Sequence, residues 1–196
     1  LPIVEPTASM IVDIGGGTTE VAIMSLGDIA TCESIRVAGD DLDESIINYM
    51  KKNHSLTIGE QTAERIKIEV GSASPMEKET KIDVRGRDNI TGMPDKKTVK
   101  SQEIREAMSE PIQAIIEVVK RTLERAEPEL SADLVENGIY ICGGVAELRG
   151  IDTVIAEATG LDVTIADDPI TCVAKGTSIY LDNLELWKAV LESDMD

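Results

Sequence analysis

The feature that most constrains the fold is a short apolar strand that ends in three consecutive glycines. The run Met10-Ile-Val-Asp-Ile14 is rich in β-branched residues, which favour a buried strand, and Gly15-Gly-Gly17 stops it abruptly. Residues 18–25 have the same strand composition, and Leu26-Gly27-Asp28 predicts a turn before a third strand over 29–37. The first part of the chain is therefore predicted to be a three-stranded antiparallel meander.

The last third of the chain alternates strands and helices. A strand over 138–142 precedes a helix over 148–158, and a strand over 162–165 precedes a helix over 169–183. Such alternation predicts parallel strands that are covered by helices. Combined with the first three strands, it predicts an α/β fold with a mixed five-stranded sheet flanked by helices.

The middle of the chain has a different sequence pattern. A helix is predicted over 42–52, because its apolar residues recur on one face. The charge-dense stretch 57–100 then indicates a small α+β insertion, with a helix over 57–71 and short strands near 80–84 and 97–99.

A long helix is predicted over 102–125, where Pro111 either kinks the helix or starts a new one as a first-turn residue. These elements predict the following division of the chain: a linker from a preceding lobe over 1–9, a large subdomain over 10–56 and 101–184, the inserted small subdomain over 57–100, and an acidic tail over 185–196.

The net charge excludes several classes of partner. The chain has 37 acidic and 19 basic residues among 196, so its formal charge at pH 7 is 19 − 37 = −18. No nucleic-acid partner is expected, because binding to phosphates needs a basic surface. An anionic membrane surface repels the chain for the same reason. No apolar run approaches the roughly 20 residues that a membrane-spanning helix needs.

The cysteines and the single histidine exclude further chemistry. Cys32, Cys142 and Cys172 are far apart and form no CxxC pair, which predicts thiols in a reducing cytoplasm rather than disulfides or a zinc site. His54 follows two lysines at the end of a predicted helix, where a cation is favoured. Ser-His-Asp and Cys-His catalysis are therefore disfavoured.

Asp13 and the loop that follows it form the strongest candidate site. A carboxylate on a buried strand is costly unless a partner such as a hydrated cation compensates it. The glycines over 15–17 let backbone N–H groups approach an anion, and Thr18 and Thr19 add hydroxyl donors. This pattern indicates a phosphate-plus-magnesium site on a hairpin and matches neither GxxxxGK[ST] nor GxGxxG. The alternative is a glycine-rich hairpin turn with an edge aspartate.

Three weaker signals accompany it. Gly143 and Gly144 follow a strand, where paired glycines let a flat ring lie close to the backbone, although many such turns are purely structural. Glu64 and Lys67 share a helical face and offer a carboxylate and an amine to ribose hydroxyls; a solvated ion pair is the alternative. The cluster Asp40-Asp41-Leu42-Asp43 offers metal ligands, but helix capping explains it better.

These motifs stand in the order of a known superfamily. The segments that carry the resemblance are Asp13-Ile-Gly-Gly-Gly-Thr-Thr-Glu-Val-Ala22, Val37-Ala-Gly-Asp-Asp-Leu-Asp43, Thr62-Ala-Glu-Arg-Ile-Lys67, Cys142-Gly-Gly-Val-Ala-Glu-Leu-Arg-Gly150 and Asp168-Pro-Ile-Thr-Cys-Val-Ala-Lys-Gly176. Together they resemble the actin/Hsp70/sugar-kinase ATPases. Within that superfamily, the segments 46–49, 58–67 and 71–75 are similar to the MreB family of bacterial actins. The resemblance covers nearly the whole chain.

The resemblance implies a fold, cofactors and a site. The fold is an actin-like (ribonuclease H-like) lobe, the second of two, with 57–100 as its small subdomain. The implied cofactors are ATP, with GTP as an alternative, and Mg²⁺. The implied site residues are, by role, Asp13 on the magnesium side, Gly15, Gly16, Gly17, Thr18 and Thr19 at the phosphates, Glu64 and Lys67 at the ribose, and Gly143, Gly144 and Val145 beside the adenine.

The implied function is that of an ATP-binding filament protein involved in rod cell shape and the guidance of cell-wall synthesis. This chain would supply half of the nucleotide cleft and is expected to bind ATP weakly and hydrolyse it negligibly by itself. No catalytic residue is assigned within it. The implied partners are other filament protomers and membrane-associated cell-elongation proteins. The implied location is cytoplasmic, at the inner face of the cell membrane, without membrane insertion by this chain.

Three alternatives remain open at this stage. A sugar or small-molecule kinase of the same superfamily would need a substrate-positioning base, and none can be assigned. A chaperone-type ATPase would need an attached peptide-binding domain. A non-hydrolysing interaction module would be indicated if Asp13→Ala left nucleotide binding of the full-length protein unchanged.

Overall fold

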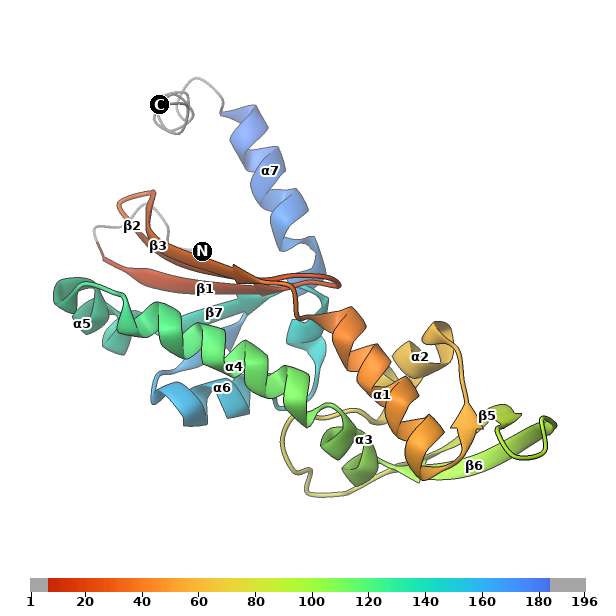
Figure 1. Ribbon diagram of the computed structural model, residues 1–196. Helices are drawn as coiled ribbons and strands as arrows, with labels where there is room; N and C mark the ends of the chain where they lie inside the picture. Colours follow the sequence, from red (N-terminus) through yellow and green to blue (C-terminus); the bar gives the residue numbers. More distant parts are fainter. Residues whose placement is uncertain (1–6, 184–196) are drawn as a thin grey trace.

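The computed structural model describes residues 7–183, which form two sheets with helices packed around them (Figure 1). The larger sheet has five strands in the order β3-β2-β1-β7-β8. In chain order these are β1 (Ser9–Ile14), β2 (Thr19–Ser25), β3 (Asp28–Ile35), β7 (Ile139–Cys142) and β8 (Val163–Ile165). The pairs β1–β2 and β2–β3 are antiparallel, whereas β7 pairs in parallel with both β1 and β8. The predicted mixed five-stranded sheet is confirmed.

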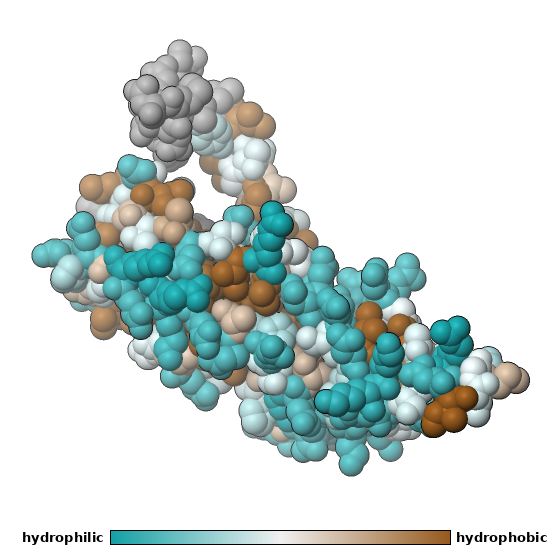
Figure 2. Space-filling view, viewed as in Figure 1, coloured by the Kyte–Doolittle hydropathy of each residue, from teal (hydrophilic) through white to brown (hydrophobic). Residues whose placement is uncertain are grey.

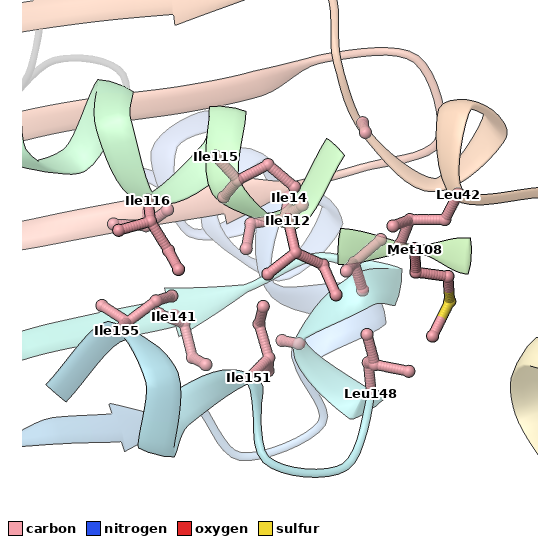
Figure 3. Packing of buried hydrophobic residues seen from close by; sticks show 14 of the residues in the cluster. Ile14, Leu42, Met108, Ile112, Ile115, Ile116, Ile141, Leu148, Ile151 and Ile155 are labelled. Carbon is pink, nitrogen blue, oxygen red and sulfur yellow. The ribbon is translucent and has the colours of Figure 1, made fainter. Parts of the chain in front are cut away.

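One face of this sheet forms the main core. Alternate residues of β1 are buried. The apolar residues of α4 (Ser109–Glu124) recur every three or four positions and so form one apolar face, which packs over this side of the sheet. Figure 3 shows Ile112, Ile115 and Ile116 of α4 packed with strand residues and with α6 (Ile151–Thr159). This aliphatic layer holds β1 and β7 in place below the loops that follow them.

The smaller sheet has three strands in the order β4-β5-β6. They are β4 (Leu56–Thr57), β5 (Lys81–Asp88) and β6 (Pro94–Lys100), so the predicted short strands are in fact a longer hairpin. Val84 and Val99 of this hairpin are buried. The helices beside it are α1 (Gly39–Asn53) and α2 (Glu60–Val70) (Figure 1).

The predicted helix over 102–125 is two helices, α3 (Ser101–Ala107) and α4, which join at Met108. Pro111 lies in the first turn of α4, where its missing N–H would have no partner inside the helix. The second of the two predictions for Pro111, a new helix, is therefore confirmed, and the kinked single helix is wrong.

Two further helices differ from the prediction. Helix α5 (Pro128–Asn137) is absent from the predicted elements, although Pro128 at its first position is a helix-start signal. The helix predicted over 148–158 begins only at Ile151, because Gly144–Glu147 forms a short 3-10 turn and Gly150 has a positive φ of 75°. Element type was therefore predictable here, whereas the start of the helix was not.

The last described helix, α7 (Cys172–Asp182), extends away from the sheet (Figure 1). It follows a 3-10 turn over Pro169–Thr171, and none of its residues is buried. Figure 2 shows apolar residues along α7; the exposed ones include Val173, Ile179 and Leu181.

Some predictions are not tested. The linker over 1–9 lies mostly outside the described residues and Ser9 already belongs to β1, while the tail over 185–196 lies wholly outside them. The division into subdomains stays a prediction, with β4 placing Leu56 and Thr57 in the smaller sheet. Within residues 7–183, no helix combines the length and apolarity needed to cross a bilayer.

Shortening a buried side chain of α4 is expected to destabilise the fold. Ile115→Ala removes a fully buried side chain and should lower the free energy of unfolding by about 3 kcal/mol. Ile90→Ala, at a position that is 84% exposed, should change it by less than about 0.5 kcal/mol. Urea unfolding followed by circular dichroism measures both. Equal losses of stability would show that α4 does not pack as described.

Candidate functional site

A cavity of about 320 Å³ opens where four parts of the chain meet. These parts are the loop after β1, the start of α1, one face of α2 and the turn after β7. Six of the predicted site residues line the cavity: Gly15, Gly16, Glu64, Lys67, Gly144 and Val145. Residues from both halves of the chain thus face one space.

The glycine loop is held against the start of α1. The Gly39 N–H donates to the Gly15 carbonyl (3.1 Å), and the Asp40 N–H donates to the Gly16 carbonyl (2.8 Å). A Cβ at Gly39 would lie 3.2 Å from the Gly15 oxygen, so a glycine allows this close approach. The loop backbone is consequently fixed at the edge of the cavity.

The three acidic residues at the start of α1, Asp40, Asp41 and Asp43, have two different roles. Asp41 caps the helix, since its Oδ2 accepts a hydrogen bond from the Ala38 N–H (2.8 Å). Asp40 and Asp43 instead line the cavity. The capping interpretation is therefore confirmed for Asp41 alone.

Lys67 is anchored to α1 rather than to Glu64. Its Nζ lies 2.8 Å from Asp43 Oδ2 and donates to the Gly39 carbonyl at 3.0 Å. The side chains of Lys67 and Asp43 are only 15% and 14% exposed. Burial raises the pKa of the Asp43 carboxyl, while the Lys67 ammonium lowers it. The ion pair thus joins α2 to α1 and leaves the Glu64 carboxylate available to the cavity.

Three of the predicted phosphate-loop residues lie outside the cavity lining. Gly17 and Thr18 are exposed, and the Thr18 carbonyl accepts a hydrogen bond from the Gly15 N–H (3.0 Å). Thr19 is fully buried, and its hydroxyl donates to the Val37 carbonyl (2.7 Å). The Thr19 hydroxyl therefore ties β2 to the segment between β3 and α1, a contact that strand pattern alone does not indicate.

The two glycines after β7, Gly143 and Gly144, also have different roles. Gly143 has a φ of 84°, and a Cβ there would lie 2.3 Å from the Ile14 carbonyl oxygen. Gly143 is therefore required by the close approach of two strand ends. Gly144 has no atom within 4 Å of its Cβ position and lines the cavity. Val145 beside it is buried and also lines the cavity.

Asp13 lies just beneath the glycine turns and does not line the cavity. It is half-buried, pairs across the parallel sheet with Cys142, and has its Oδ1 2.5 Å from the Cβ position of Gly143. Burial, and then the Asp13 carboxylate, raise the pKa of the Cys142 thiol to about 12. Residues 7–183 contain no group of three His, Cys, Asp or Glu side chains that could hold a metal ion. Any cation at Asp13 must therefore take most of its ligands from elsewhere.

The motifs did not single out every cavity residue. The additional lining residues include Gly39, Ile68, Gly71, Glu147, Arg149 and Ile170. Ile68 lies four residues after Glu64, so helical spacing alone places it on the same face. Arg149 and Ile170 gave no such signal, because their position depends on contacts between distant parts of the chain.

The sheet order and the cavity between glycine turns define an actin-like lobe, and solved structures agree. MreB5 of Spiroplasma citri bound to AMPPNP superposes with a TM-score of 0.91 at 36% identity, covering 98% of this chain and 57% of that one. The MamK double helical filament, at 23% identity and a TM-score of 0.68, supports the fold alone.

Sequence comparisons define the family. The model described as MreB/Mbl protein matches residues 1–189. Mbl of Bacillus subtilis is 46% identical over 94% of this chain, and MreB of Escherichia coli is 47% identical over 95% of it. The chain belongs to the MreB/Mbl family, as the resemblance predicted. It spans about half the length of these relatives, 56% and 54% respectively.

The two glycines after β7 should respond differently to the same substitution. Gly143→Ala places a Cβ against the Ile14 carbonyl at a positive φ, and should lower the melting temperature by several degrees or prevent folding. Gly144→Ala meets open space and should leave the melting temperature nearly unchanged. Thermal unfolding compares them. A tolerated Gly143→Ala would contradict the close approach of the strand ends.

The cysteines should differ in reactivity. With a pKa of about 12 and a buried side chain, the Cys142 thiol should resist alkylation by iodoacetamide at pH 8, whereas the exposed Cys32 should react within minutes. Raising the pH to 9 should still leave Cys142 unmodified, because its thiolate fraction stays below about 1%. Peptide mass spectrometry of the native protein gives both rates. Rapid labelling of Cys142 would contradict its placement.

Proposed function

We propose that this chain is one lobe of an ATP-binding cytoskeletal filament protein that maintains rod cell shape and guides cell-wall synthesis. The observation that carries the proposal is the cavity in which six predicted site residues from distant motifs meet. The curated relatives named above are cell shape-determining proteins, and MreB5 of Spiroplasma citri has been solved with AMPPNP and with ADP.

The lining residues suit a nucleotide. The backbone of Gly15 and Gly16 would face the phosphates, since these residues have no side chain of their own to block an anion. The Asp40 carboxylate lies beside Gly16, 3.6 Å from its Cβ position, which makes a cation necessary with the phosphates. Glu64 would accept hydrogen bonds from ribose hydroxyls, and Lys67 would donate to the sugar or to a phosphate oxygen. Gly144 and Val145 would lie beside the base, where the open Cβ position of Gly144 leaves room for a flat ring.

The charges of the cavity favour a nucleotide that is bound with Mg²⁺. Its lining contains four acidic residues and two basic ones, a formal charge of 2 − 4 = −2; the acidic ones are Asp40, Asp43, Glu64 and Glu147, and the basic ones are Lys67 and Arg149. A polyphosphate adds further negative charge, which a divalent cation offsets. Mg²⁺ keeps several waters and takes one or two carboxylates plus phosphate oxygens, so a single Asp13 is a sufficient protein ligand.

One lobe supplies only part of a phosphate clamp. Phosphoryl transfer depends on donors and cations that surround the transferred group from several sides. The exposed apolar residues of α7 are those expected of a surface that a further lobe covers. The chain alone should therefore bind ATP weakly and hydrolyse it negligibly, and ATP rather than GTP is the proposed ligand.

Assembly and location follow from the family. We infer that the full-length protein associates with copies of itself, by analogy with the filament formed by MamK, a neighbour in fold. It would work in the cytoplasm at the inner face of the cell membrane, together with membrane-associated cell-elongation proteins. This lobe is not proposed to insert into the membrane.

Filling the cavity should abolish nucleotide binding without unfolding the protein. Gly16 has an ordinary φ, and a Cβ there meets only Asp40 at 3.6 Å, so Gly16→Leu projects a side chain into the cavity at little structural cost. Binding of magnesium–ATP to the full-length protein should weaken by at least about tenfold.

The matched control is Gly59→Leu, at an exposed position with no atom within 4 Å of its Cβ, which should bind ATP normally. Isothermal titration with and without EDTA measures the affinity and its dependence on magnesium. Normal ATP binding by Gly16→Leu would contradict the proposed site.

A further inference from the structure

Arg149 connects the two walls of the cavity, which come from distant parts of the chain. One wall is α2, which packs mainly against α1, α3 and β5. The opposite wall is the turn over 144–148, which follows β7. A ligand can touch both walls only if their separation is fixed. A residue that holds α2 relative to this turn therefore governs binding without contacting the reacting atoms.

The side chain of Arg149 caps the C-terminus of α2. The helix ends at Val70, so its last carbonyl groups have no partner inside the helix. Arg149 donates from one guanidinium nitrogen to the carbonyls of Glu69 and Gly71, both at 3.2 Å. A cation at this end of a helix also interacts favourably with the helix dipole.

The backbone of the same residue holds the segment after α2. The Ala73 N–H donates to the Arg149 carbonyl at 2.7 Å, and Ser72 forms a parallel bridge with Arg149. Gly150 has a φ of 75°, and a Cβ there would lie 2.1 Å from Ser74 Oγ. Residues 72–74 thus lie directly against residues 149–150.

A second arginine fixes this segment from the other side. Arg105 of α3 donates to Ser72 Oγ (2.7 Å) and to the Ser74 carbonyl (3.0 Å), and it pairs with Glu79 (2.5 Å). These contacts, like the backbone contacts of Arg149, do not involve the Arg149 side chain. Removing that side chain consequently releases the end of α2 while the following segment keeps its path.

We propose that Arg149 is a positioning residue whose guanidinium holds the last turn of α2, and with it Lys67 and Glu64, at the separation from Gly144 that a nucleotide requires. The inference rests on the proposed nucleotide site. Arg149 itself lines the cavity, so its loss removes a basic group from the lining as well as the anchor of α2. The positioning role is therefore read from hydrogen exchange at the end of α2 in the absence of nucleotide, which a lost contact with the ligand would not change.

The test compares three variants of the full-length protein: Arg149→Ala, Arg149→Lys and the control Arg125→Ala. Arg125 lies at the exposed end of α4 and pairs with Glu33 at 3.3 Å, away from the cavity. In the absence of nucleotide, amide hydrogen exchange at Val70 and Gly71 should accelerate about tenfold in Arg149→Ala, less in Arg149→Lys, and not at all in the control. Amides of β7 and α4 should exchange at the rate of the unmodified protein.

The affinity for magnesium–ATP carrying a fluorescent group should fall about tenfold in Arg149→Ala and be partly restored in Arg149→Lys. Unchanged exchange at the end of α2, or exchange that accelerates equally in β7 and α4, would overturn the positioning role. So would normal ATP affinity in Arg149→Ala. A failure of the unmodified protein to bind ATP would instead contradict the proposed function, and the exchange rates would still decide whether Arg149 holds α2.

Discussion

The parallel pairing of β1 with β7 is the interaction on which the rest of the structure depends. It aligns Met10 with Ile139 and Asp13 with Cys142, so that the two strands end at the same edge of the sheet. The glycine loops that follow therefore emerge side by side, and the close contact of Gly143 with the Ile14 carbonyl fixes their separation. Because α1 begins at the first loop and carries the partner of Lys67, α2 is tied on one side to the same arrangement, and Arg149 ties its C-terminal end to the turn after β7. The cavity is thus a consequence of strand register rather than of any one motif.

The acidic character of the chain has different effects at different scales. The charge of −18 on this chain disfavours anionic partners, and it would oppose the approach of like-charged subunits in the proposed filament. Magnesium or added salt would therefore favour assembly of the proposed filament at low ionic strength. Within the cavity, the Lys67–Asp43 pair neutralises itself and leaves Glu64 as a free acceptor. The bound cation, more than any basic side chain, would compensate the phosphates.

The sequence was informative where local chemistry decides the structure. The strand before Gly15, the turn at Gly143 and the helical spacing of Glu64 and Lys67 all follow from residues that are neighbours in the chain. Contacts over long distances were not predictable in this way. The partner of Lys67 is on another helix, the Thr19 hydroxyl donates to the segment between β3 and α1, and Arg149 reaches the end of α2. The start of α6 failed for a related reason, because Gly150, whose Cβ position lies against Ser74, sets the backbone before Ile151. At α1 the capping residue was predictable, since Asp41 caps the helix through the Ala38 N–H, but the helix begins at Gly39, before the predicted start.

The distance along the chain between β1 and β7 also has a consequence in time. Ile139 follows Ile14 by 139 − 14 = 125 residues, so at a synthesis rate of about 5–20 residues per second roughly 6–25 s pass before β7 has been made. During that interval the first three strands can form their hairpins, but β1 lacks its neighbour and presents an open row of backbone N–H and C=O groups. The central strand of the finished sheet, β1, is therefore an edge strand while the chain is being synthesised. Until β7 has been made, β1 needs protection from pairing with other chains. The finished structure, in which β1 is a central strand, does not show this need.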